Sequence, residues 1–313
     1  NFLGNEQIKA NTFALKSISE SILLRNRILL SFEQATQTND PELLEEILTF
    51  VIVGGGATGV EVAGSLADMR KLILPKDYPH VDINRMKIIL VDGSPRVLMS
   101  MSEESSAEAA KTLRKRGVEI LGEKFVKKCS KSSIELSDGT LIRSRNVIWA
   151  AGVKPNNLSG LREEAFFKGR LSVDGANKVN GYDNIFALGD TAIQCTEKYP
   201  NGHPQVVQVA IQMAGNLADN LNRMTEGKSF RNFEYKDKGS MATIGRNAAV
   251  AEIAGLKFKG ILAWWIWLFI HILCIVGMRN KVAVFIDWVW SYFNYDVSLR
   301  LFIRPRFNDM YRK

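Results

Sequence analysis

The stretch FVIVGGGATGVEVAG at residues 50–64 constrains the fold more than any other part of the chain. A continuous apolar run, typical of a buried parallel strand, enters a loop with Gly54, Gly56 and Gly59 and continues as a helical pattern. The G-x-G-x-x-G spacing permits a tight turn, a close approach of the backbone to pyrophosphate and close packing of helix on strand. The helix N-terminus behind the loop favours negative charge. The stretch therefore predicts a dinucleotide-binding β-α-β unit.

An acidic residue, Asp92, ends the next predicted strand, MKIILVD. It lies further from the glycines than the usual spacing of about 20 residues, because the loop PKDYPHVDINR is inserted. A carboxylate here accepts hydrogen bonds from a ribose 2′-OH and repels a 2′-phosphate, which favours NADH over NADPH. An ordinary surface acid is the alternative for Asp92, and the nearby Arg96 keeps NADPH open.

The rest of the chain continues the β-α-β pattern and then departs from it. We expect an amphipathic helix over 15–35, a polar linker TQTNDPE, and a crossover helix that Pro75 stops. A helix over 103–116, a short strand GVEIL and strands around the turn Ser137–Gly139 complete a doubly wound unit over roughly 48–155. A strand over 184–192, a helix over 205–224 and a β meander over 233–255 follow.

Charge and tryptophan are concentrated at the C-terminal end. The net charge is +8, and nine basic against three acidic side chains after residue 256 supply +6 of it. Five of the six tryptophans lie there too, inside apolar segments. This pattern favours an anionic bilayer surface over nucleic acid. The three widely spaced cysteines signal neither a zinc site nor a disulfide framework.

The apolar run at 261–276 has 16 residues, broken only by His271. As a helix it would cover roughly 24 Å, less than the ~30 Å hydrocarbon core. Over 282–302, polar residues recur at helical spacing (Asp287, Ser291, Asn294 and Ser298). One polar stripe on an aromatic helix is typical of a helix that lies in the membrane interface. We expect a monotopic anchor of two helices, with a dimer interface or a transmembrane hairpin as alternatives.

Several small or acidic residues indicate further contacts with a cofactor. The stretches WAAGV, with Gly152, and ALGD, with Gly189, place small residues where cofactor rings or phosphates can approach the backbone. Asp190 ends an apolar strand, where it would bond a flavin ribityl chain or cap the next helix. Glu61 lies in the first turn of the helix after the glycine loop, where its simplest role is to complement the helix dipole.

Five stretches occur together and in order: GGGATGVEVAG, ALGDTA, VQVAIQMA, FEYKDKGSMATIGRNAAVAEI and LAWWIWLFIHILCIVGMRNKVAVFIDWVWSYF. With them the chain resembles the type II (non-proton-pumping) NADH:quinone oxidoreductases over almost its whole length. The resemblance implies an α/β, Rossmann-like flavoprotein with two dinucleotide-binding domains and a C-terminal membrane-anchoring helical segment.

The resemblance also implies how the chain is divided. Residues 1–47 correspond to the end of the first half of the FAD domain and a connecting helix, and 48–155 to the NADH-binding domain. Residues 156–255 correspond to the second part of the FAD domain with the quinone-site helix, and 256–313 to the anchor. The FAD pyrophosphate loop would precede residue 1, so we expect an N-terminally truncated chain.

Residue roles carry over position by position. Gly54, Gly56, Gly59 and Asp92 would hold NADH, and Glu61 would lie near the nicotinamide–flavin stack as a proton donor to quinone. Gly189 and Asp190 match the second FAD motif.

The quinone site matches less completely. Gln208 and Gln212 match two glutamines of the family's A-Q-x-A-x-Q-Q motif, although Val207 and Met213 replace its leading Ala and final Gln. Without the family, two polar residues on one helix face would be the simpler interpretation. Lys281 matches a basic residue at the mouth of that site.

The implied reaction is FAD-dependent oxidation of NADH with two-electron reduction of ubiquinone or menaquinone, without proton pumping and without a metal. The implied location is the cytoplasmic face of a membrane, and a homodimer is left open. The rival interpretations are a sulfide:quinone oxidoreductase, another disulfide-type flavoprotein, and an inactive fragment that binds NADH and membrane.

Overall fold

The computed structural model describes residues 2, 4–156 and 158–294. These residues form two compact units. The first unit contains Phe2–Ala151 together with the chain from Gly239, and the second contains Gly152–Lys238. Of the C-terminal features predicted above, Ser298 and five of the nine basic side chains lie outside the described residues.

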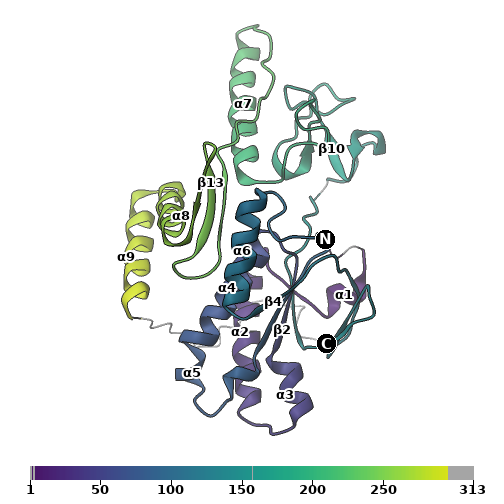
Figure 1. The fold of residues 1–313 in the computed structure, drawn as a ribbon. Helices are drawn as coiled ribbons and strands as arrows, with labels where there is room; N and C mark the ends of the chain where they lie inside the picture. Colours follow the sequence, from purple (N-terminus) through teal and green to yellow (C-terminus); the bar gives the residue numbers. More distant parts are fainter. Residues whose placement is uncertain (1, 3, 157, 295–313) are drawn as a thin grey trace. The chain divides into compact units, whose positions relative to one another are not determined.

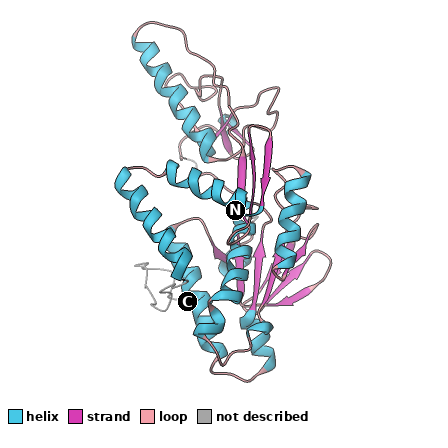
Figure 2. Cartoon of the chain, turned by 60° about the vertical axis from the view of Figure 1, so that its left-hand side comes forward, coloured by secondary structure: helices cyan, strands magenta, loops and turns pink. Residues whose placement is uncertain are grey.

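A parallel five-stranded sheet forms the centre of the first unit (Figures 1 and 2). Its order is β1 (Phe13–Ala14), β8 (Asn146–Trp149), β2 (Thr49–Val53), β3 (Lys87–Val91) and β4 (Val118–Leu121), and every neighbouring pair is parallel. All five residues of β2 are buried. The continuous apolar run of β2 fits this position, since a parallel strand covered on both faces cannot alternate with polar residues.

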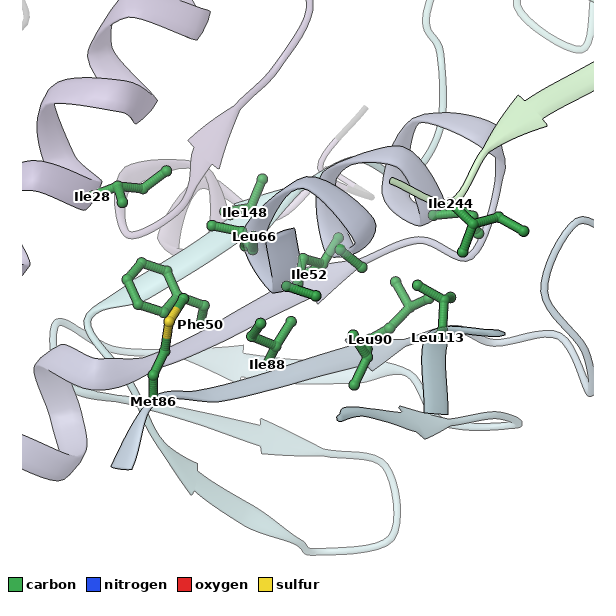
Figure 3. Packing of buried hydrophobic residues seen from close by; sticks show 14 of the residues in the cluster. Ile28, Phe50, Ile52, Leu66, Met86, Ile88, Leu90, Leu113, Ile148 and Ile244 are labelled. Atoms are coloured by element: carbon green, nitrogen blue, oxygen red, sulfur yellow. The ribbon is translucent and has the colours of Figure 1, made fainter. Parts of the chain in front are cut away.

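Helices cover one face of this sheet. They are α2 (Ile18–Ala35), α4 (Ala57–Leu72) and α6 (Glu103–Lys115), and their apolar sides share a core with alternate strand residues. Figure 3 shows Phe50 and Ile52 of β2 in this core. The predicted Rossmann-like parallel sheet is thereby confirmed, but helices cover only one of its faces.

An antiparallel sheet covers the other face. The strands β5 (Val126–Cys129), β6 (Ser133–Leu136) and β7 (Leu141–Arg143) form it, and α1 (Glu6–Ala10) packs beside it. Val51, Val53 and the other alternate strand residues point into this second core, which is the outcome of period-two side-chain alternation.

Local sequence explains where the helices begin. The structure also shows that two predictions were wrong. Ser17 and Glu20 form a reciprocal capping box at the start of α2. The expected linker TQTNDPE instead ends in α3 (Pro41–Leu48), which Asp40 caps and which starts on a proline. Pro75 does not stop the crossover helix. Helix α4 has already ended, and Pro75 lies in the first turn of the short helix α5 (Leu74–Asp77).

The C-terminal part of the first unit consists of a meander followed by two helices. The strands β12 (Ser240–Thr243), β13 (Ala249–Ile253) and β14 (Leu256–Lys259) are antiparallel, and residues 233–239, expected within the meander, add no strand. Helices α8 (Gly260–Cys274) and α9 (Met278–Asn294) follow. Neither these nor any other helix in the described ranges combines the length and apolarity needed to cross a bilayer.

The second unit has little regular structure apart from one long helix, α7 (Val207–Thr225). The strand expected over 184–192 is wrong. Phe186 makes an isolated bridge, the chain then enters the 3-10 turn η3 (Gly189–Thr191), and only Ala192 belongs to a strand, β11 (Ala192–Ile193). The remaining elements are short: η1 (Ile83–Arg85) in the first unit, and η2 (Glu163–Ala165), β9 (Phe166–Phe167) and β10 (Arg170–Ser172) in the second.

The two units group the chain differently from the expected four segments. Strand β1 and helices α2 and α3 belong to the first unit, since β1 extends the parallel sheet. The first boundary, at 151/152, is close to the expected 155/156, whereas the second lies at 238/239 rather than 255/256.

Candidate functional site

The glycine loop between β2 and α4 is shaped by two glycines that admit no side chain. Gly54 has φ +115°, and a Cβ there would lie 2.9 Å from the carbonyl carbon of Ala150. A Cβ on Gly59 would overlap the carbonyl oxygen of Gly54. Gly54 is therefore required both by its positive φ, which L-residues disfavour, and by the nearby backbone. Gly59 is required because the backbone of Gly54 leaves no space for a side chain.

Gly56 differs from these two. Its φ is −71°, and a Cβ there would meet no atom within 4 Å. The conformation of the loop does not require glycine at this position. The absence of a side chain instead leaves open space beside the backbone. Gly56, Ala57 and Thr58 are exposed, and Gly56 caps α4 without a side-chain hydrogen bond. The first-turn N–H groups are left for an anion.

Asp92 lies directly beside this loop. Its Oδ2 accepts a hydrogen bond from Gly55 N at 2.5 Å, and its Oδ1 accepts one from Ser94 N at 2.6 Å. The carboxylate is therefore fixed next to the glycine loop despite the 37-residue separation along the chain. Each oxygen keeps a second lone pair, so the group can still accept from a ribose hydroxyl.

Glu61 lies on α4, one turn beyond the loop, and contacts the meander. Its Oε1 accepts from Thr243 N at 3.3 Å and from the Thr243 hydroxyl at 3.4 Å. Burial raises the pKa of Glu61, and the Thr243 hydrogen bonds and the charge of His271 oppose that rise. Thr243 bonds Oε1 alone, so Oε2 is the atom that can carry a proton.

His271, on α8, is the residue whose electrostatic interaction lowers the pKa of Glu61. Its Nδ1 lies 2.8 Å from the Trp267 carbonyl oxygen, and its ring stacks on Trp267 at 3.9 Å between centroids. Since a carbonyl only accepts, Nδ1 carries a proton and donates it to this oxygen.

In the second unit, Gly189 and Asp190 form the start of η3. Gly189 has φ +64°, and a Cβ there would lie 3.0 Å from the Ala210 Cβ on α7. The Gly189 N–H points to Met213 Sδ at 3.3 Å. The main-chain carbonyl of Asp190 accepts from Gln205 Nε2 at 3.2 Å. Among the described residues the Asp190 carboxylate has no hydrogen-bond partner, so it can accept from a polyol.

Gln208 and Gln212 lie one turn apart on α7 and hold an extended segment against it. Gln212 donates to the Lys236 carbonyl at 2.9 Å and accepts from Lys236 N at 3.0 Å. The side-chain oxygen of Gln208 accepts from Lys238 N at 3.2 Å. These bonds give both glutamines a structural role in the second unit, in addition to any contact with a ligand.

Two further predicted residues lie apart from these groups. Lys281, on α9, donates from Nζ to the Leu273 carbonyl at 2.9 Å and so satisfies the C-terminal end of α8. Gly152 is exposed, has φ +67° and follows β8 at the boundary between the units.

Comparisons with known proteins match both the part of the chain that contains the glycine loop and the part that contains the C-terminal helices. A family model described as pyridine nucleotide-disulphide oxidoreductase matches residues 9–214, and one described as the NDH2 C-terminal domain matches residues 238–294. The chain belongs to the type II NADH:quinone oxidoreductase family. The family predicted from the sequence motifs is confirmed.

Individual relatives agree with this assignment. The type II NADH:quinone oxidoreductase Ndh of Mycobacterium tuberculosis is 36% identical over 307 residues, which cover 93% of this chain and 64% of that protein. NdhA of the same organism is 33% identical, with the same coverage of both proteins. The chain thus spans about two thirds (64%) of the length of these relatives.

Among solved structures, NDH2 from Plasmodium falciparum in complex with NADH superposes with a TM-score of 0.86. The match covers 97% of this chain and 77% of that one, at 19% identity. It confirms the α/β, Rossmann-like fold.

The structure brings Gly54, Gly56, Gly59 and Asp92 into one site and adds a residue that sequence reasoning missed. Thr243 holds Glu61 from 182 residues away, so no local spacing could have indicated it. His271 stood out in the sequence only as the break in an apolar run, and its position near Glu61 also depends on tertiary packing.

Proposed function

We propose that the protein containing this chain oxidises NADH and passes two electrons to a membrane quinone, with FAD as cofactor and without proton pumping. The observation that carries the proposal is the glycine loop, in which no Cβ fits at Gly54 or Gly59 and the space beside Gly56 is open. Such a loop before an uncapped helix suits the pyrophosphate of a dinucleotide. The relatives' names and the NADH complex of the Plasmodium falciparum protein support the same substrate.

NADH is the preferred nucleotide in this proposal. The fixed carboxylate of Asp92 binds a ribose 2′-OH and repels a 2′-phosphate. Arg96, which sequence reasoning kept as a partner for NADPH, donates from Nη1 to the Met101 carbonyl at 3.0 Å and to the Ser102 carbonyl at 3.4 Å. Because its guanidinium is engaged within its own loop, Arg96 is less suited to a 2′-phosphate.

The second unit fits part of an FAD molecule. The carboxylate of Asp190, which interacts electrostatically with Arg170 but accepts no hydrogen bond from the described residues, suits the hydroxyls of a ribityl chain. Gly189 and Gly152, both at positive φ, suit a close approach of the backbone. Bound FAD supplies the two-electron carrier between NADH and quinone. The protein supplies binding and orientation on either side of it.

Quinone reduction needs two protons, and Glu61 is the residue proposed to donate. Its raised pKa keeps a larger fraction protonated near neutral pH than an exposed glutamate would have. Gln208, Gln212 and Lys281 are the proposed contacts of the quinone and of the entrance to its site. Ubiquinone and menaquinone both suit this role.

The two C-terminal helices are the proposed membrane contact. Trp265, Phe269, Trp290 and Phe293 are each more than half exposed, and Ala263 is the only fully buried hydrophobic residue of α8. Large aromatic side chains in water are unfavourable, so we propose that this surface lies in the interface of a bilayer on the cytoplasmic face. A homodimer that covers part of it is the alternative.

Steady-state consumption of NADH with a soluble quinone tests the function. The complete protein, supplied with FAD, is expected to consume NADH only when quinone is present, and to use NADPH far more slowly. Consumption that does not depend on quinone would contradict the proposal. NADH binding without any turnover would favour the inactive-fragment interpretation.

A further inference from the structure

Helices α8 and α9 enclose a groove of about 650 Å³, here called the aromatic groove. This volume lies within the range of about 300–1,000 Å³ that is usual for small-molecule sites. The side chains that line it are mostly apolar, and many are aromatic, among them Trp264, Trp265, Trp267, Trp288, Tyr292 and Phe293. The groove is therefore suited to a long apolar group.

A second, larger cavity of about 1,150 Å³ lies between α4, α6 and the loop after α5. We call it the basic cavity. Six basic residues line it, against three acidic ones, which leaves a surplus of three positive charges. The basic residues are Arg70, Lys71, Lys111, Lys115, Arg116 and Arg246. The cavity is therefore suited to an anion.

The two cavities share a wall. Asp68 and Arg246 line both of them. The Arg246 guanidinium lies 4.2 Å from the ring centroid of Tyr292 in the aromatic groove and donates to the Tyr292 carbonyl oxygen. Its backbone carbonyl, on the other side, accepts from Arg116 at 2.6 Å. An apolar site and a cationic site are thus adjacent and meet at one arginine.

The acid at this junction is already neutralised. Asp68 forms an ion pair with Arg116 and accepts from Arg246 N at 2.5 Å. Lys71, Lys111 and Lys115, by contrast, are exposed, and none of the three forms an ion pair within the described part of the chain. The surplus positive charge therefore rests on side chains that are available to a ligand.

We propose that these two cavities form one binding site for an anionic phospholipid. The headgroup phosphate would lie among the lysines of the basic cavity, and an acyl chain would lie in the aromatic groove. The inference rests on the proposed membrane association but not on the redox reaction, because lipid binding needs neither NADH nor quinone. A quinone, being uncharged, would leave the surplus of cations unexplained, and so would the apolar face of a second copy.

Flotation of the full chain with vesicles tests the site. Vesicles of phosphatidylcholine alone are compared with vesicles that also contain phosphatidylglycerol, at physiological ionic strength. The triple substitution Lys71→Gln, Lys111→Gln, Lys115→Gln should weaken binding to the phosphatidylglycerol vesicles on the order of 100-fold, about fivefold for each lysine. Binding to phosphatidylcholine vesicles should stay unchanged.

Lysines on the opposite face of the parallel sheet provide a control with the same change of charge. These residues, Lys127, Lys128 and Lys131, are exposed on and beside β5. Their replacement by Gln should weaken binding less than about threefold, because charges beyond a Debye length of roughly 8 Å from the lipid are screened. Equal losses in the two triple variants would mean a general charge effect and would overturn the site.

Ser291→Trp tests the aromatic groove separately, since Ser291 lines it and is exposed. Filling the groove should reduce the preference for phosphatidylglycerol at least tenfold, the equivalent of about two buried methylene groups. A full preference in this variant would overturn the acyl-chain assignment. A detergent-solubilised dimer that this variant dissociates would assign the groove to a second copy instead.

The NADH:quinone assay on the same samples separates the two proposals. Wild-type protein that turns over NADH but shows no preference for phosphatidylglycerol would refute the lipid site alone. A preference without turnover would refute the proposed reaction alone.

Discussion

Replacement of Gly56 by alanine separates binding of the nucleotide from folding of the loop. A Cβ at this position meets no atom within 4 Å, and φ of −71° is open to any residue. Alanine is a weaker N-cap than glycine by up to about 1 kcal/mol. The lower entropy of the unfolded chain offsets this by about 0.4–1 kcal/mol. The free energy of unfolding should therefore change by less than about 1 kcal/mol.

The effect on NADH should be larger. A methyl group in the space where the pyrophosphate approaches the backbone displaces it from the helix N-terminus. The loss of one charge-assisted hydrogen bond, about 1.5–3 kcal/mol, corresponds to roughly a 10- to 150-fold weaker Kd. Calorimetric titration with NADH, together with urea denaturation of the same samples, measures both quantities.

Gly215→Ala is the matched control for Gly56→Ala. Gly215 lies exposed within α7, and its Cβ would also meet no atom within 4 Å. This variant should bind NADH as the wild type does and gain up to about 1 kcal/mol of stability. An unchanged NADH affinity in Gly56→Ala, with intact folding, would refute the assignment of this loop to the pyrophosphate.

Three other predictions follow from single side chains. The raised pKa of Glu61 means that the folded state disfavours its ionised form, so the free energy of unfolding of the wild type should fall relative to that of Glu61→Gln as pH rises from about 4.3 through the folded pKa. Urea denaturation of both proteins at several pH values measures this, and a difference that does not change with pH would contradict it. Asn220 is fully buried, and its amide bonds both the N–H and the carbonyl of one loop residue, Arg231, so Asn220→Ala should cost about 2–3 kcal/mol in thermal or urea unfolding. A cost below about 0.5 kcal/mol would contradict that role. Burial raises the pKa of the Cys129 thiol to about 11, so a maleimide at neutral pH should label the exposed Cys195 and Cys274 in the native protein but not Cys129. Rapid labelling of Cys129, detected by mass spectrometry, would show that its core opens.

The nucleotide-binding part of the fold could be predicted from sequence because its determinants are local. The apolar run, the glycines and the helix that follows lie within residues 50–64, and the acid at the end of β3 is one strand further on. The local signals for α3 were also present, since Asp40 and Pro41 are a cap and a first-turn proline. Reading that stretch as a linker missed the helix.

Other features depend on contacts that no local pattern encodes. Strand β1 has two residues, and it exists because it pairs with β8 more than 130 positions away. The apolar stretch 184–192 resembles a strand, but only an isolated bridge at Phe186 and the first residue of β11, Ala192, pair with other strands. Likewise, the partner of Glu61 on β12 and the junction of Arg246 with α9 arise only when the meander packs against α4.

Absorption spectroscopy of the flavin tests the central claim most directly. The complete protein, purified in detergent with FAD bound, would be mixed with NADH without oxygen and then with a soluble quinone. The proposed function predicts that NADH bleaches the flavin band and that quinone restores it. A flavin band that NADH leaves unchanged, or that quinone fails to restore, would contradict the proposed reaction.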